Sequence, residues 1–469
     1  MKNQECKVNR LKENRSLLFF KCKIYNDELR NPWFQYFERR RVSEMSDRRR
    51  GYFDEEKETI SKERREAYQR ERLSEILQYG YHHSKAIRSA FEKVGLKPEA
   101  IRELKDLEKI PVTKKADLVN AQKEGPPFGG FGVISEEGVR RIYVSPGPVY
   151  EPGEWDYEDR RWAQALFSCG IRSGDIVLNT FNYHLTPLAL MLDESLRMMK
   201  ATVVPVGPGN ISMQINLMRQ LRATAYIGTP SFLMAIIEAA EGMHLDFKKD
   251  FHLEATFVGA EMFPESLRQK LESKLDLMVR QGYGTVDVGC LGYECPEKKG
   301  MHIPEDVIVE IVDTETGKQL KTGATGEIVA TNFSKVFPML RFATGDLSYL
   351  IEDPCGCGRT SLRLGRIMGR TDQVTKVWGI FIHPWQVDEL MTKFPVIANY
   401  QVVVTRKDYR DEMAVYVELK HEISDKLGMK KRLEKEIQET LKVTAEVIFT
   451  EKGGIPDRAK KIDDRRIWE

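Results

Sequence analysis

A long stretch of alternating elements in the middle of the chain constrains the fold most. Over residues 141–346, short apolar runs of strand character alternate with helix-like stretches. The clearest runs cover residues 175–179, 201–206, 225–228 and 255–259. Such alternation predicts an α/β fold, with β-α units around a largely parallel sheet. Ligand sites in sheets of this kind form from loops at the strand ends, where Gly and Pro cluster here.

The segments on either side of this stretch have different patterns. Residues 64–94 read as helix, and Ile87, Ala90, Phe91 and Val94 are spaced to form one apolar core stripe. Beyond residue 372 the pattern becomes a short β/α set, with strands expected at 402–404, 413–417 and 443–449 and a helix at 429–441. We therefore expect an extension at 1–44 outside the folded unit, a large domain at 45–371 and a small domain at 372–469.

Composition narrows the classes of function. The chain has 469 residues, which is long for one domain, and a net charge of +2, which gives no field for binding nucleic acid. The longest apolar run near the start is only residues 17–20, so neither an export signal nor a membrane span is expected. Seven cysteines without an export signal argue against a disulfide framework. We expect a cytoplasmic protein.

Four short motifs follow one another along the chain. They are Gly259-Ala260-Glu261, residues 281–287 (QGYGTVD), residues 341–347 (RFATGDL) and residues 368–372 (MGRTD). In this order and spacing they resemble the phenylacetate–CoA ligase branch of the adenylate-forming enzymes, and the resemblance runs from about residue 52 to the C-terminus. It implies a large domain built on mixed and parallel sheets with flanking helices, and a small, mobile α+β C-terminal cap. It also implies joining of a carboxylic acid to AMP, using ATP, and then to coenzyme A.

The resemblance places the adenine and acyl-site walls at the first two motifs. Glycines there let the backbone approach a flat base, and a tyrosine offers a stacking face. Asp287 stands where the family has a Mg²⁺-binding glutamate, and its shorter side chain would weaken that contact. An ordinary strand and turn is the alternative. The residues implied in this wall are Gly259, Ala260, Glu261, Tyr283, Gly284 and Thr285.

The later motifs imply a ribose site and a hinge. Asp346 matches the aspartate that accepts hydrogen bonds from both ribose hydroxyls, which suits a carboxylate because it has two acceptor oxygens. Arg370 matches an arginine that faces the same ribose. Asp372 matches the hinge between the two domains.

The phosphate-binding loop departs from the family pattern. The aligned stretch, residues 145–153 (SPGPVYEPG), keeps Ser145 and Gly147 as candidate phosphate contacts. Its three prolines lack N–H donors, Val149 lacks a hydroxyl and Glu151 adds negative charge beside the pyrophosphate. Losing two hydrogen bonds to a charged group costs about 3 to 6 kcal/mol. ATP-dependent adenylation is therefore the least secure part of the resemblance.

The C-terminal lysine of the family is also displaced. It should follow a Pro-containing turn and stabilise charge at the α-phosphate. Here the turn is shortened, the aligned position is Arg458, and Lys460 is the nearest substitute. The alternative is that Lys460 and Lys461 are merely solvated near the end of the chain.

Two further groups of residues remain. Cys295, His302, Cys355 and Cys357 would make a closed tetrahedral set suited to structural zinc, with four unliganded side chains as the alternative. Cys169 and Cys290 are expected in the core. Tyr183 and His184 fall where the acyl pocket of the family begins, although a lone histidine is more often structural.

These observations favour an acid–CoA ligase for a small aromatic acid, with ATP/AMP, Mg²⁺ and coenzyme A implied by the resemblance. Tyr183 and its aromatic neighbours would suit an aryl ring, and Lys460 and Asp287 would assist the chemistry. Two alternatives stay open. One is a degenerate relative that binds nucleotide or a CoA thioester without adenylation, and the other is nucleotidyl transfer without coenzyme A. A homodimer is one possibility, and the sequence alone does not determine the oligomeric state.

Overall fold

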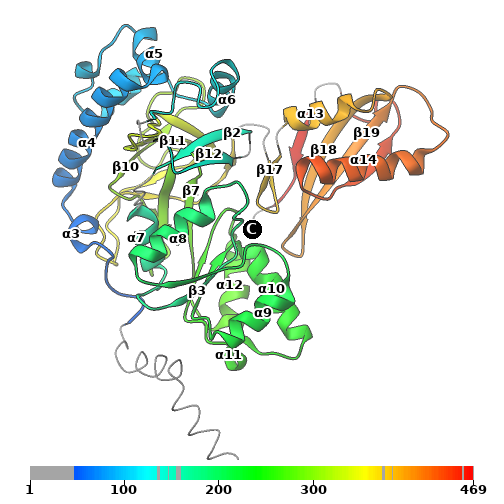
Figure 1. Ribbon diagram of the computed structural model, residues 1–469, viewed down its shortest axis with the longest axis horizontal. Helices are drawn as coiled ribbons and strands as arrows, with labels where there is room; N and C mark the ends of the chain where they lie inside the picture. Colours follow the sequence, from blue (N-terminus) through cyan, green and yellow to red (C-terminus); the bar gives the residue numbers. More distant parts are fainter. Residues whose placement is uncertain are drawn as a thin grey trace, which may run out of the picture. The chain divides into compact units, whose positions relative to one another are not determined.

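The structure is a computed structural model that describes residues 47–134, 138–145, 147–154, 160–371, 375–382, 384–456 and 459–467 (Figure 1). The expected extension at 1–44 and the expected hinge Asp372 lie outside the described residues. The domain boundaries expected from the sequence therefore stay predictions.

A nine-stranded sheet forms the centre of the fold. Its strand order is β13-β14-β9-β8-β7-β6-β5-β3-β4. The strands β4, β3, β5, β6 and β7 run parallel, and β8 returns antiparallel to β7. The expected α/β fold with a largely parallel sheet is confirmed. The bounds are β3 Ile176–Asn179, β4 Thr202–Pro205, β5 Ala225–Gly228, β6 Ala255–Val258, β7 Val279–Thr285, β8 Gly289–Glu294, β9 Met301–His302, β13 Leu350–Ile351 and β14 Arg363–Leu364.

Helices cover this sheet because its central strands are apolar on both faces. Every residue of β3, β5 and β6 is buried, as expected for parallel strands packed on both sides. Figure 1 shows α7 and α8 beside the strands, with α9 to α12 grouped further along. The bounds are α6 Lys115–Glu124, α7 Arg160–Ser168, α8 Leu188–Met198, α9 Ile211–Gln220, α10 Pro230–Gly242, α11 Phe247–Asp250 and α12 Glu265–Leu275.

A second, antiparallel sheet has the order β10-β11-β12-β15. Its register places Asp346 of β12 opposite Arg370 of β15, so two residues from separate motifs become neighbours. A separate hairpin, β1-β2, precedes α7 in the chain. The bounds are β1 Arg141–Ser145, β2 Val149–Gly153, β10 Val307–Val312, β11 Gly326–Asn332, β12 Phe342–Ser348 and β15 Gly369–Arg370.

The N-terminal helical region is two helices rather than one. After α3 (Glu55–Glu58), α4 spans Lys62–His83 and α5 spans Lys85–Lys93. Ser84 separates α4 from α5, and its hydroxyl accepts a hydrogen bond from the Ile87 N–H as an N-cap. Ile87 and Phe91 are buried as expected, whereas Val94 lies just past the helix end and is exposed. Short 3-10 turns follow at Pro98–Ala100 and Leu104–Lys109.

The C-terminal segment forms its own four-stranded sheet of order β20-β19-β18-β21, with α13 and α14 packed on it (Figure 1). The last strand, β21, was not expected, and it pairs parallel to β18. The bounds are β18 Ile397–Lys407, β19 Arg410–Leu419, β20 Glu446–Thr450, β21 Ile462–Asp464, α13 Pro384–Thr392 and α14 Lys426–Leu441. A small hairpin, β16 (Thr375–Val377) and β17 (Ile380–Ile382), precedes this sheet in the chain. In the part of the chain that the structure describes, every helix is too short or too polar to cross a bilayer.

Candidate active site

One large cleft brings most of the sequence-predicted residues together. Its volume is about 1660 Å³, and its walls come from strand ends of the central sheet, from β12 and β15 and from the C-terminal segment. The predicted residues that line it are Gly259, Ala260, Glu261, Tyr283, Gly284, Thr285, Asp287, Asp346, Arg370 and Lys460. The structure therefore places four separate sequence motifs around a single space.

Three predicted residues make direct contact in this cleft. The Tyr283 hydroxyl donates to one Asp346 oxygen at 2.8 Å, and Arg370 donates to the other at 3.0 Å. Both donors hold the carboxylate in one orientation at the edge of the cleft. Burial, and then the Asp346 charge, raise the pKa of the Tyr283 phenol well above its usual value, so this hydroxyl stays protonated and remains a donor.

The glycines of the wall are required by close packing. A side chain at Gly284 would meet the Gly289 carbonyl oxygen at 2.3 Å, and one at Gly282 would meet the Phe257 ring at 2.6 Å. No Cβ fits at either distance, so these glycines shape the floor of the cleft. The Thr285 hydroxyl at the end of β7 is buried and has no hydrogen-bond partner among the described residues. A buried hydroxyl of this kind on a cleft wall is suited to a bound polar ligand.

Sequence reasoning missed a lysine in the lining of the cleft. Lys376 of β16 lines the cleft, and its ammonium lies within electrostatic range of Glu261 and Asp346. Burial lowers the pKa of Lys376 to about 8, against the raising effect of those two carboxylates. The Glu261 carboxylate accepts a 2.9 Å hydrogen bond from the Ser231 hydroxyl, which fixes its position. Lys376 carries no local sequence signal beyond lying soon after the MGRTD motif.

A second missed lysine contacts the predicted metal ligand. Lys115, the first residue of α6, donates to both oxygens of Asp287 at 3.1 Å, and the Asp287 side chain is only 3% exposed. Because an ammonium already satisfies both oxygens, Asp287 as placed does not fit a direct Mg²⁺ ligand. Its assignment as a metal ligand stays a prediction.

The phosphate-loop region forms the β1-β2 hairpin. Ser145 and Gly147 lie at its turn, and neither is among the residues that line the cleft. Glu151 sits within β2, paired across the hairpin with Tyr143, and is 3% exposed. Burial, and then the nearby Asp287 charge, raise the pKa of Glu151 to about 8. The Glu151 charge expected beside the pyrophosphate is instead a buried carboxyl behind Asp287.

Of the remaining predicted residues, Lys460 lines the cleft, whereas Tyr183 and His184 do not. The exposed Lys460 lines the cleft, and its backbone carbonyl accepts a 3.0 Å hydrogen bond from Gln401. Tyr183 and His184 are absent from the cleft lining, although Phe181 and Asn182 contribute to it. The Tyr183 hydroxyl donates to Asp193 at 2.8 Å, and His184 is exposed. The strand end before them turns Phe181 inward instead.

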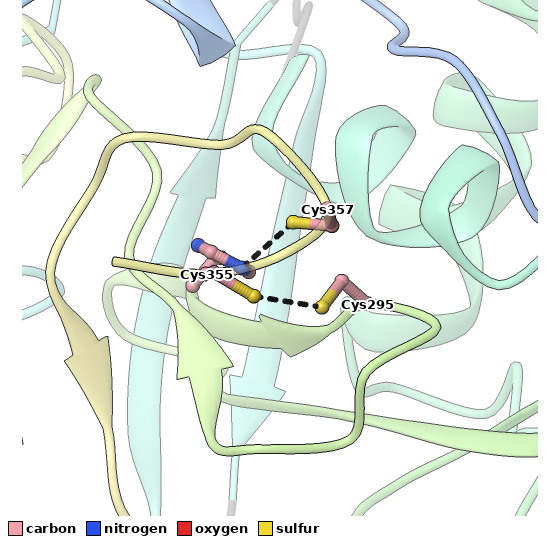
Figure 2. A group of neighbouring side chains, drawn as sticks. Cys295, Cys355 and Cys357 are labelled. Atoms are coloured by element: carbon pink, nitrogen blue, oxygen red, sulfur yellow. Dashed lines mark hydrogen bonds between the residues drawn. The ribbon is translucent and has the colours of Figure 1, made fainter. Parts of the chain in front are cut away.

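The four predicted metal ligands gather at one place, and Figure 2 shows Cys295, Cys355 and Cys357 pointing toward a common centre. One ligand atom from each of the three cysteines and from His302 lies within 4.8 Å of all the others. The Cys295 and Cys355 sulfurs are 3.6 Å apart. Tetrahedral zinc with Zn–S bonds of about 2.3 Å requires S···S separations of about 3.7 Å. The donor set therefore fits zinc.

Neighbouring groups orient this cluster. The other ring nitrogen of His302, Nδ1, lies 3.2 Å from the Ser361 hydroxyl, while Nε2 lies 3.3 Å from the Cys357 sulfur. Hydrogen bonding from Cys295, and then from His302, lowers the pKa of the Cys357 thiol, which favours the thiolate that a metal needs. None of the four ligands is among the residues that line the cleft, which suits a structural role. Cys169 and Cys290 are buried core residues, as expected.

This fold and cleft define the class of adenylate-forming enzymes. The AMP-binding enzyme family model matches residues 195–334, and the AMP-binding enzyme C-terminal domain model matches residues 379–467. Among solved structures, 2-hydroxyisobutyryl-CoA ligase in complex with 2-HIB-AMP and CoA superimposes with a TM-score of 0.82 at 23% identity, covering 88% of this chain and 92% of that one. The same ligase in its postadenylation state gives a TM-score of 0.67. At this identity the likeness concerns the fold.

Curated relatives place the chain within that class. Phenylacetate-coenzyme A ligase of Thermus thermophilus is 31% identical over 434 residues, which cover 86% of this chain and 96% of the relative. The Escherichia coli enzyme of the same name is 30% identical over 418 residues, covering 85% and 94%. The chain belongs to the phenylacetate–CoA ligase family of adenylate-forming enzymes.

Proposed function

We propose that this protein joins a carboxylic acid to coenzyme A through an acyl-adenylate. The observation that carries the proposal is the Tyr283–Asp346–Arg370 contact on a cleft large enough for a nucleotide and an acyl group. An oriented carboxylate with two acceptor oxygens suits the two neighbouring hydroxyls of a ribose. The curated relatives named above are phenylacetate-coenzyme A ligases, which supports the same reaction here.

The chemistry has two displacements. In the first, a carboxylate oxygen of the acid attacks the α-phosphorus of ATP, and pyrophosphate leaves. In the second, the thiol of coenzyme A loses its proton to water and its sulfur attacks the acyl carbon; the bond between that carbon and the phosphate oxygen breaks, and AMP leaves with the bonding electrons. Both steps place negative charge on phosphate oxygens, and the cleft-lining ammonium groups of Lys376 and Lys460 are suited to stabilising it.

We propose a small aromatic acid of the aryl acetate type as the substrate. Aromatic side chains are prominent along the cleft, and a flat ring packs favourably between such faces. Phenylacetate is in the name of the curated relatives. The aromatic residues in the lining are Trp162, Phe181, Phe232, Phe257, Phe263, Tyr283, Phe342 and Trp378.

We propose structural zinc at the Cys295, His302, Cys355 and Cys357 cluster. The donor distances given above support this choice of metal. The chemistry that zinc would supply is cross-linking of the loop after β8 with the loop that contains Cys355 and Cys357.

The test of the function is product formation by the purified protein. The protein is incubated with ATP, Mg²⁺, coenzyme A and a panel of aryl acetates, benzoates and short aliphatic acids, and acyl-CoA and AMP are quantified by mass spectrometry. We expect aryl acetates to give equimolar acyl-CoA and AMP. Acyl-adenylate that accumulates without thioester would identify nucleotidyl transfer instead, and absence of both products with every acid would overturn the proposal.

The role of Lys460 is tested by pyrophosphate exchange into ATP, which reports on the first displacement alone. Lys460→Ala should slow pyrophosphate exchange into ATP by about 10- to 100-fold, because one electrostatic contact to the transition state is lost. Lys461→Ala is the matched control, since the Lys461 ammonium lies over the Tyr400 ring within the C-terminal sheet. Equal rates in the two variants would remove Lys460 from the site.

A further inference from the structure

An exposed tryptophan stands at the turn of the β16-β17 hairpin. Trp378 and Gly379 are the two turn residues, with φ of 48° and 79°. Two positive φ values define the hairpin turn that favours Asn or Gly, and a bulky side chain at its first position is strained. The geometry of the turn therefore does not explain why a tryptophan occupies this position.

The indole is held in place rather than left loose. Its Nε1–H donates to the Asp411 carbonyl at 2.9 Å, and the Trp378 backbone N–H donates to the Asp411 carboxylate at 3.4 Å. Asp411 is itself anchored by Arg466 at 2.8 Å. Two contacts to one buried residue fix both the edge of the ring and the turn that carries it.

This fixed ring faces the cleft. Trp378 is 41% exposed and lines the cleft together with Gly379 and Lys460. Leaving a large apolar face in water is unfavourable, and backbone strain at such a residue is characteristic of ligand-binding positions. An aromatic face with ammonium groups on the same cleft is suited to a flat heterocycle that carries phosphates.

We propose that Trp378 is the stacking platform for the adenine ring of coenzyme A. The inference rests on the proposed function. The adenine of AMP is attached to the ribose expected at Asp346, where Tyr283 already supplies an aromatic wall. The adenine of coenzyme A is a second ring, and it needs an aromatic surface of its own. The exposed ammonium groups of Lys442 and Lys460 line the same cleft and suit the phosphates of coenzyme A.

The experiment measures binding of three ligands by isothermal titration to the full-length protein. Coenzyme A, 4′-phosphopantetheine, which lacks the adenosine, and AMP are each titrated into wild type, Trp378→Ala and Trp378→Phe. Met243→Ala is the matched control, because Met243 is a similarly exposed apolar residue, 45% exposed, that is not among the residues lining the cleft, and its three affinities should match those of wild type.

We expect Trp378→Ala to weaken coenzyme A binding by about 5- to 100-fold, the range for loss of one base stack. Trp378→Phe should keep most of the affinity, and the affinities for phosphopantetheine and AMP should change less than about twofold. Should Trp378→Ala melt at a lower temperature, Trp378→Leu, which keeps the bulk without the π face, should show the same selective loss.

Three results would overturn the inference. Unchanged coenzyme A affinity in Trp378→Ala excludes the stack, an equal loss for phosphopantetheine moves the contact to the pantetheine arm, and an equal or larger loss for AMP assigns the ring to the other adenine. In each case wild type still binds coenzyme A, so the proposed function stands. A wild type that binds no coenzyme A overturns both.

Discussion

The hydroxyl of Tyr283 and the carboxylate of Asp346 are joined by a 2.8 Å hydrogen bond, although 63 residues separate them in the chain. β7 and β12 belong to different sheets, so this bond ties the central sheet to the antiparallel one at the cleft. Because Arg370 holds the second Asp346 oxygen, the carboxylate is oriented before any ligand arrives. Orientation of this kind lowers the entropy cost of binding.

Asp346→Asn should weaken AMP binding by about 10- to 100-fold, since hydrogen bonds to a charged group contribute about 1.5 to 3 kcal/mol. Tyr283→Phe should lose less, about 2- to 10-fold, because it removes only the orienting bond. Isothermal titration with AMP measures both. Asp313→Asn, at the exposed turn after β10, is the control, and an Asp346→Asn variant that binds AMP as wild type does would refute the ribose site.

The purified protein should contain about one equivalent of zinc. Cys355→Ser should reduce it below about 0.2 equivalents and lower the Tm, because closed structural zinc sites contribute folding free energy. Cys290→Ser is the matched control, since Cys290 is buried outside the cluster. This variant should keep its full zinc content even if its Tm falls. Metal analysis by mass spectrometry decides the matter, and full occupancy in Cys355→Ser would contradict the assignment.

The ion pair of Lys115 with Asp287 should show measurable coupling. A double-mutant cycle of Lys115→Met and Asp287→Asn, followed by urea unfolding, should give a coupling energy of about 1 to 2 kcal/mol. The value lies below that of fully buried pairs because the Lys115 side chain is 28% exposed. Coupling near zero would mean that the pair does not persist in solution, which would free Asp287 for a metal.

The buried carboxyl of Glu151 should make stability depend on pH. Its pKa is raised from 4.5 to about 8, so the folded protein binds this proton more tightly than the unfolded chain does. The contribution of Glu151 is therefore fully present below pH 4.5 and is lost as pH rises through 8. Glu151→Gln removes this loss, so its free energy of unfolding relative to wild type should rise between pH 5 and pH 8.

The rise should be on the order of a few kcal/mol, since one pKa unit corresponds to about 1.4 kcal/mol. Urea unfolding at the two pH values measures it. Glu154→Gln is the control, because Glu154 follows β2 and accepts a hydrogen bond from the Ser334 hydroxyl rather than facing Asp287. A difference between Glu151→Gln and wild type that is the same at both pH values would contradict the raised pKa.

Periodicity and motif spacing were enough to predict the class of fold. Buried strands such as Ala225–Gly228 are recognisable because every residue in them is apolar or small, and that property is local. The boundary between two consecutive helices and the presence of a short edge strand are not predictable from periodicity. Ser84 ends one helix and begins the next through a single side-chain hydrogen bond, and β21 exists only because β18 offers an edge to pair with.

Some residues of the cleft can likewise be predicted from the sequence, and others cannot. Asp346, Arg370 and Tyr283 lie in motifs whose spacing can be read along the chain, whereas Lys115 and Lys376 come from distant elements and have no motif of their own. Position along the chain predicts Tyr183 and His184 at the acyl pocket, whereas the turn after β3 brings Phe181 and Asn182, and neither of these two residues, to the lining of the cleft. Local spacing specifies which side chains an element carries, but contacts across more than a hundred residues depend on how the elements pack. That packing brings Lys115 to Asp287 and leaves Trp378 facing the cleft.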